Sequence, residues 1–222
     1  MFLQSPVVTT QSQATPQEMN VMIVSRTRMK NHICVGAVSR CGRTVRLLNE
    51  QGYNQPTDTS LQIGQFYDIT YTERSNKLAP HTEDILVHSF AHRGQARSAR
   101  AILFSHVKNN RVRIFKDPLD QLFDGCLQLT DTSPASCYMS QATGTSSFST
   151  VFWQPDRDLH HQKNFTHDYY IYDNRIKIKF IGFQFPLASL TSQHIVRLSL
   201  ARWWSADELE EKRCYLQLSG WY

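Results

Sequence analysis

The sequence predicts a mainly β protein in which two consecutive small β-barrels are joined by a short helical connector. Short apolar runs recur between turn-forming residues, and several alternate apolar with polar side chains, which is the period of a half-buried strand. Five such runs precede residue 91 and five follow residue 148. Five short strands over about 70 residues fit a small barrel better than a sandwich.

The chain is expected to divide into a leader and two domains. Residues 1–18 are rich in Gln, Thr, Ser and Pro and show no sustained period, so they are expected to form a disordered leader. The first barrel is expected in residues 19–110. The second is expected in residues 111–222, together with the helical connector and a polar loop at 131–147.

The strands expected in the first barrel are residues 20–25, 32–38, 43–48, 65–72 and 84–90. The second and third of these runs flank a tight turn at 39–42 and therefore predict a hairpin. The fourth run alternates Phe66, Asp68 and Thr70 with Tyr67, Ile69 and Tyr71, which is the pattern of a strand with two different faces.

The connector carries two helical signals on either side of a short strand at 111–116. Residues 94–110 place alanines and aliphatic residues near helical spacing, although 101–107 alone also fit a strand. Residues 117–125 begin with Asp and Pro, the order that favours a helix start, and end on Gly. Residues 131–147 are small and polar, which indicates a loop.

The strands expected in the second barrel are residues 149–154, 167–173, 175–183, 194–204 and 213–222. Asp173 and Asn174 predict a hairpin turn between the second and third of these runs. Residues 205–212 predict one or two turns of acidic helix. The chain ends on the apolar strand with Trp221 and Tyr222, so these last residues are expected to be anchored in the fold.

Charge is distributed unevenly between the two halves. Residues 19–116 contain 15 Lys and Arg against 6 Asp and Glu, whereas residues 117–222 contain 9 against 12. A basic half next to a slightly acidic half predicts an anionic partner for the first half. An ordinary solvated basic surface is the alternative.

Cysteine usage and hydropathy indicate a cytoplasmic protein without a membrane partner. The 5 cysteines are odd in number and scattered, and the N-terminal residues lack the basic and apolar regions of a signal peptide. No apolar run approaches the roughly 20 residues that span a bilayer. No ligand spacing predicts a metal or cofactor, and the cluster His160, His161 and His167 is interpreted as solvated, its role left open.

The opening of the first barrel resembles the dual OB-containing domain family. The resemblance rests on a strand, a Cys-Val-x-Gly element, a hairpin into a strand with Arg, and a His-x-Glu motif, which map onto Cys34, Val35, Gly36, Arg46, His81 and Glu83. It covers residues 21–88 and is looser beyond. It implies two OB-like barrels, an association with prokaryotic conflict and defence systems, and binding of nucleic acid or nucleotides.

An OB fold binds oligonucleotides across its second and third strands and the loops beside them. This places the expected phosphate-binding rim on the hairpin and its neighbouring loops, with Arg26, Arg28, Lys30, Arg40, Arg43, Arg46, Arg74 and Lys77. The aromatic residues expected to stack on bases are Tyr53, Phe66, Tyr67 and Tyr71, each with core packing as the alternative.

Arg46 lies inside an apolar run and therefore has several interpretations. It can extend over the barrel exterior, reach a ligand, or pair with an acid such as Glu83. A small polar pocket of Arg46, His81 and Glu83 is one expectation, and a satisfied histidine on a solvated turn is the alternative.

The leading functional hypothesis is a non-catalytic module of a prokaryotic defence system that binds single-stranded nucleic acid or a nucleotide. The alternative is an adaptor whose aromatic C-terminal barrel docks a larger effector protein encoded nearby, through segments 202–204 and 219–222. An enzyme is the third class. Asp68, Glu83 and Asp84 lack the spacing of a nuclease, and no phosphate-binding loop or nucleophile elbow is present.

Overall fold

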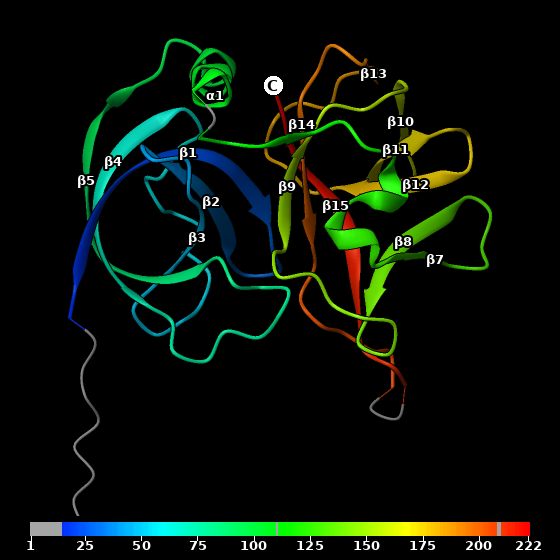
Figure 1. Ribbon diagram of the computed structural model, residues 1–222, viewed down its shortest axis with the longest axis horizontal. Helices are drawn as coiled ribbons and strands as arrows, with labels where there is room; N and C mark the ends of the chain where they lie inside the picture. Colours follow the sequence, from blue (N-terminus) through cyan, green and yellow to red (C-terminus); the bar gives the residue numbers. More distant parts are fainter. Residues whose placement is uncertain (1–14, 110, 208–209) are drawn as a thin grey trace, which may run out of the picture.

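The computed structural model describes residues 15–109, 111–207 and 210–222, and it consists of two β units side by side (Figure 1). The first unit is a closed barrel. Its strands, in spatial order, are β1 (Gln17–Arg28), β2 (Ile33–Ser39), β3 (Thr44–Leu48), β5 (Asp84–Gln95) and β4 (Gln65–Glu73).

Two pairings close the barrel. The long first strand β1 pairs with β2 from Val21 to Arg28 and with β4 from Gln17 to Met22, and its pairing with β2 is irregular between Ile23 and Ser25. β3 then pairs in parallel with β5. Such irregularities bend a strand and raise its twist, which helps a sheet to curve into a barrel.

The first barrel agrees with the strands expected from the sequence. The turn at 39–42 is present, and Gly42 adopts a φ of 91°, where the carbonyl of Arg111 leaves no room for a side chain. The N-terminal boundary is different from the prediction, because Gln17 and Glu18 already belong to β1 and pair with Tyr71 and Thr70 of β4. Residues 15 and 16 are exposed and without regular structure, and residues 1–14 of the predicted disordered leader lie outside the described residues.

The second unit is a ten-stranded sheet. Nine of its strands follow one another in the spatial order β13 (Ser189–Leu190), β10 (Leu159–Lys163), β11 (Asp168–Tyr172), β12 (Ile176–Phe180), β8 (Ala135–Ser140), β15 (Arg213–Trp221), β14 (Val196–Leu200), β9 (Thr150–Trp153) and β6 (Ile114–Phe115). The tenth strand, β7 (Leu127–Leu129), pairs with β8.

All five strands expected in this half are present, but the sheet contains more. The expected polar loop at 131–147 is wrong in its middle, where Ala135–Ser140 form β8 and bury Cys137 and Met139. This partly polar segment forms a strand because β7, β12 and β15 supply hydrogen-bonding neighbours on both sides. The hairpin turn at Asp173 and Asn174 is confirmed, with φ values of 52° and 53°.

The connector is less helical than expected. The α-helix is α1 (Ala99–Lys108), and it lies within the range assigned to the first barrel. The second helical signal forms only two 3-10 turns, η1 (Leu119–Gln121) and η2 (Phe123–Gly125). The acidic helical turn expected at 205–212 is not helical in its described part, and 208–209 lie outside it. None of the helices in the described ranges has the length and apolarity needed to cross a bilayer.

The two units share a hydrophobic interface. The inward residues of β1–β5 form the barrel core, whereas Met22, Val24 and Val38 point outward and pack against Phe152 and Tyr222 of the second unit. β1 and β2 are therefore buried on both faces, which explains their nearly continuous apolar sequence. The expected anchoring of the C-terminus is confirmed, because Tyr222 is buried and its hydroxyl donates to the carbonyl of Val24.

Candidate nucleic-acid interface

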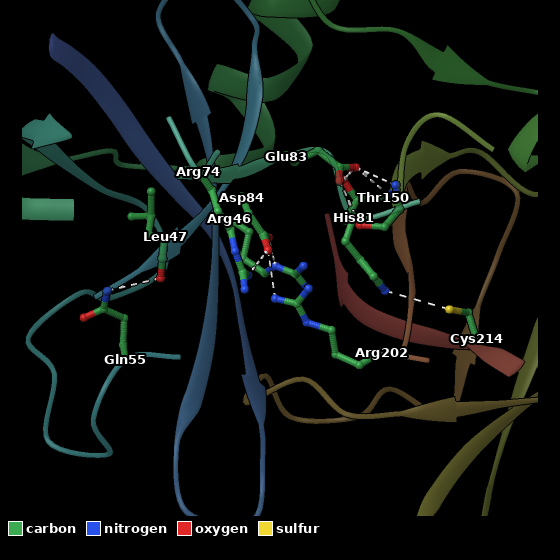
Figure 2. Close-up of polar contacts among 11 residues, drawn as sticks. Arg46, Leu47, Gln55, Arg74, His81, Glu83, Asp84, Thr150, Arg202 and Cys214 are labelled. Atoms are coloured by element: carbon green, nitrogen blue, oxygen red, sulfur yellow. Dashed lines mark hydrogen bonds and ion pairs between the residues drawn. The ribbon is translucent and has the colours of Figure 1, made fainter. Parts of the chain in front are cut away.

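A buried ion-pair network lies where the β2–β3 hairpin meets the second unit (Figure 2). The parallel register of β3 and β5 places Arg46 opposite Asp84, and Arg46 Nε donates to Asp84 Oδ1 at 2.5 Å. Arg74 and Arg202 contact the other carboxylate oxygen at 3.0 and 2.8 Å. Burial alone would raise the pKa of Asp84, but Arg46 and Arg202 outweigh it and hold that pKa below its ordinary value.

This geometry corrects the expected pairing of Arg46 with Glu83. Asp84 is the first residue of β5 and faces Arg46, whereas the side chain of Glu83, the residue before the strand, points to Ser149 and Thr150. The Glu83 carboxylate accepts hydrogen bonds from the Ser149 amide at 2.6 Å, the Ser149 hydroxyl at 2.9 Å and the Thr150 amide at 3.0 Å. Glu83 therefore fastens the first barrel to the beginning of β9, and the predicted pocket of Arg46, His81 and Glu83 does not form.

His81 is buried between the units. Its Nε2 lies 3.8 Å from the Cys214 thiol (Figure 2). Burial, reinforced by the nearby Arg46 and Arg202, lowers the pKa of His81 to about 3. The imidazole is therefore neutral at physiological pH. It belongs to the buried interface between the units and is not a surface residue that could contact a ligand.

The face on which an OB fold ordinarily binds its ligand is thus covered here. Gly36 and Arg46 are cross-strand partners of β2 and β3, and a side chain at position 36 would collide with Arg197 of β14. The loop between β4 and β5 also packs on the second unit, where the Trp203 ring donates to the Ala79 carbonyl at 2.9 Å. Oligonucleotide therefore has no access to this face in the structure.

The predicted basic rim is divided and partly neutralised. Arg43 and Lys77 both pair with Glu73, each at 2.6 Å, and Arg74 pairs with Asp84. Arg40 is exposed at the turn after β2. The remaining predicted cations lie toward the opposite end of β2. Arg26 is opposite Val35 and Arg28 is opposite Ile33, so Arg28 and the following Lys30 are roughly 20 Å from the turn at the ordinary rise of a strand.

The aromatic residues predicted to stack on bases also divide into buried and exposed ones. Tyr67 and Tyr71 are 2% and 3% exposed and belong to the barrel core, so the stacking role expected for them is wrong. Phe66 packs against the apolar cluster between the units. Tyr53 is 65% exposed, and its stacking role stays a prediction.

A groove of about 420 Å³ opens beside the end of β1, at the junction of the two units. Arg28 and Lys30 line it from the first unit, and Lys179 of β12 lines it from the second. Asp168, within hydrogen-bonding distance of His161 at 2.8 Å, also lines the groove, so three cationic side chains face one carboxylate. The groove therefore carries a positive charge to which both units contribute.

An aromatic ring completes this surface. The guanidinium carbons of Arg26 and Arg28 lie 5.0 and 4.8 Å from the centre of the Phe183 ring, which is 41% exposed. A backbone bridge between Thr27 and Gly182 fixes this arrangement. We call Arg26, Arg28, Lys30, Lys179 and Phe183 the basic–aromatic groove.

Sequence reasoning found the first three of these residues and missed the other two. The alternation of Lys177 and Lys179 with buried isoleucines showed that these lysines face solvent, but no local signal shows that Lys179 lies near Lys30. The histidines of uncertain role are now placed, with His160 and His161 on β10 and His167 at the groove. Within the described ranges, no group of three His, Cys, Asp or Glu could hold a metal ion.

Comparison with known proteins identifies the family. Residues 19–221 match the dual OB-containing domain. The chain belongs to this family. No curated protein matches it. A solved chain described as "Structural mimicry for functional antagonism" is 11% identical, with a TM-score of 0.33 and coverage of 96% of this chain and 98% of that one.

The family assignment agrees with the observed topology. A dual OB-containing domain should contain five-stranded Greek-key barrels, and the strand order β1-β2-β3-β5-β4 of the closed barrel fits this arrangement. The match extends through the second unit, whose sheet is larger than the five strands of a minimal OB fold. This dual OB-containing domain is therefore a binding module of OB type in which the two units are packed together.

Proposed function

We propose that this dual OB-containing domain binds single-stranded nucleic acid in the basic–aromatic groove, as a non-catalytic module of a prokaryotic defence system. The observation that supports it most is the combination of Arg28, Lys30 and Lys179 around one groove with Arg26 and Arg28 stacked on Phe183. Proteins that bind single strands combine a positive groove with aromatic rings that stack on bases. The defence setting comes from the family resemblance.

The distribution of carboxylates favours this surface over the hairpin rim. Glu73 and Asp84 neutralise Arg43, Lys77 and Arg74. No ion pair of Arg28, Lys30 or Lys179 with a carboxylate occurs within the described residues. Phosphate contacts need cations that are not already paired, so the groove offers more binding energy per residue.

The adaptor alternative has less support. Its aromatic segments are largely used inside the molecule, since Trp203 holds the Ala79 carbonyl and Trp221 packs on the core of the second unit. Trp204 is exposed, but a single exposed ring is ordinary for a soluble surface. Docking of a larger effector protein therefore remains a prediction from the sequence.

Fluorescence anisotropy with a labelled single strand of about 12 nucleotides, within the usual site size of OB folds, tests the proposal. The triple variant Arg28→Ala, Lys30→Ala and Lys179→Ala should weaken binding at least about tenfold at low salt. The salt slope should fall by about 0.7 for each phosphate that the variant no longer neutralises. The matched control is Arg40→Ala, Arg43→Ala and Lys77→Ala, which removes three cations from the hairpin rim and should change affinity much less.

Two results would contradict the proposal. One is that the wild-type protein fails to bind single strands at low salt. The other is that the control variant loses more affinity than the groove variant, because the hairpin rim would then be the binding surface.

A further inference from the structure

A second, smaller cavity lies next to the basic–aromatic groove, between the two units. Its volume is about 140 Å³, and the guanidinium-bearing residues Arg46, Arg197 and Arg202 line it. The cavity and the groove share Met29, Ile181 and Gln217 as lining residues, so the two spaces adjoin. Arg202 is exposed, which gives the cavity a side open to solvent.

Arg197 is the feature that the fold does not explain. It is 4% exposed, and its Nη1 donates to the Ser219 hydroxyl at 2.8 Å, while its Nε has no acceptor. Among the described residues, no carboxylate pairs with it within 4.0 Å. A buried cation without a partner is costly, and burial lowers the pKa of Arg197 accordingly.

The sequence makes room for this cation. A Cβ atom at Gly36 would lie 2.7 Å from Arg197 Nη2 and 2.5 Å from the Ser25 hydroxyl oxygen. A side chain at this point of β2 would collide with the guanidinium in its present position. The glycine that follows Cys34 and Val35 therefore accommodates a charged side chain from the second unit.

The surroundings carry an excess of positive charge. Arg46, Arg74 and Arg202 share the Asp84 carboxylate, and Arg46 Nη2, like Arg197 Nε, lacks an acceptor. With Arg197, the cluster contains four guanidinium groups, and the carboxylates that act on Arg46 and Arg197 electrostatically are Asp84 and Glu83. Two positive charges remain, and a phosphate monoester carries about −1.5 to −2 at pH 7.

We propose that this cavity binds a phosphate dianion, supplied either as free phosphate or as the terminal phosphate of a strand in the neighbouring groove. The volume supports a small anion, because it exceeds the roughly 30 Å³ of a water molecule and is below the roughly 300 Å³ at which drug-sized sites begin. Planar guanidinium forks suit the tetrahedral oxygens of phosphate. The strand-end source rests on the proposed function, whereas the phosphate site does not.

Thermal unfolding with orthophosphate against chloride at equal ionic strength tests the site by itself. Phosphate should raise the Tm of the wild-type protein, because a ligand that binds only the folded state stabilises it. Arg197→Met should reduce this increase to the general stabilisation that phosphate gives by exclusion from the protein surface. It should leave the Tm in chloride equal or higher, since an apolar residue of similar volume replaces an unpaired buried cation. Arg202→Gln, at an exposed position, should also reduce the phosphate effect, and Arg113→Gln, with a side chain 72% exposed, should not.

Fluorescence anisotropy distinguishes the two sources of phosphate, the free anion and the end of a strand. It compares oligonucleotides that are identical except for a 5′-phosphate, a 3′-phosphate or no terminal phosphate. A strand end is the source if one phosphorylated form binds at least about tenfold tighter than the hydroxyl form and Arg197→Met removes the difference. Free phosphate is the source if orthophosphate raises the Tm while a terminal phosphate leaves the affinity for the oligonucleotide unchanged.

The inference is overturned if phosphate and chloride give the same Tm and all oligonucleotides bind equally, or if phosphate raises the Tm of Arg197→Met as much as that of the wild type. Failure of every oligonucleotide to bind would instead contradict the proposed function, and the Tm experiment would still decide the cavity.

Discussion

The β2–β3 face and the basic–aromatic groove are both rich in arginine, but the second unit covers the first and leaves the second open. On the covered face, Arg46 is buried and shares Asp84 with two other arginines. In the groove, Arg28 and Lys30 are exposed and stand beside an exposed phenylalanine. Packing between the units therefore decides whether a cation of the first barrel is structural or free to bind an anion.

Because the β2–β3 face is covered, we expect the ligand of this OB-like barrel in the basic–aromatic groove and not on that face. An isolated OB fold presents its second and third strands to a ligand. In this protein Gly36 of β2 packs against Arg197 of β14, and Arg46 of β3 lines the cavity between the units. Glu83, just before β5, adds hydrogen bonds to the beginning of β9. The remaining open surface combines the end of β1 with β12 and the segment after it, so neither unit contains the whole groove.

Removal of the central carboxylate should have the largest effect. Asp84→Asn leaves three guanidinium groups around a neutral amide and should lower the free energy of unfolding by about 3–5 kcal/mol, as expected when a buried ion pair loses one partner. Glu73→Gln is the control, because this half-exposed carboxylate also binds two cations but should cost about 1 kcal/mol or less. Denaturation in urea measures both, and equal losses would show that the Asp84 network is no more structural than a surface pair.

The covered face also predicts a smaller, pH-dependent effect. His81 has an ordinary pKa of 6.5 and a pKa of about 3 in the folded protein, since burial disfavours its charged form. The unfolded chain therefore binds a proton between these values while the folded protein does not, so stability falls as the pH falls below 6.5. The loss should reach at most about 1.4 kcal/mol per pH unit.

Comparison of His81→Gln with wild-type protein between pH 7 and pH 5 measures this contribution. The variant should lose less stability on acidification, whereas the control His160→Gln, at an exposed position of β10, should behave like the wild type. Asp84 does not interfere, because its pKa lies below its ordinary 3.8 and its contribution is lost only at lower pH. Identical acid profiles for His81→Gln and wild type would contradict a neutral, buried His81.

Local sequence patterns predicted the strands of the first barrel, but the contacts of its buried arginine depend on the pairing of strands that are far apart in the chain. Apolar runs, alternation and the turn at 39–42 are properties of neighbouring residues, so they predicted the strands of the first barrel correctly. The partner of Arg46 depends on the parallel register of β3 and β5, which joins residues far apart in the chain. A difference of one position between Glu83 and Asp84 then changes the direction of the side chain and with it the role of the carboxylate.

The same reason explains the elements and residues that were missed. The sequence of β8 is partly polar, and it is a strand only because three neighbours pair with it. Arg197 is visible in the sequence as a charge within an apolar run, like Arg46, but its position against Gly36 is a product of packing between the units. Lys179 and Phe183 reach the groove by the same packing.

One photocrosslinking experiment tests the central claim most directly. A single strand that contains 4-thiouridine is crosslinked to the protein, and the crosslinked peptides are identified by mass spectrometry. The claim is that the open groove binds the strand and the covered β2–β3 face does not. The expected crosslinks lie in residues 26–30 and 179–183, with loss of signal in the triple groove variant. Crosslinks concentrated at residues 40–46 and Tyr53 would contradict it, because the strand would then follow the hairpin.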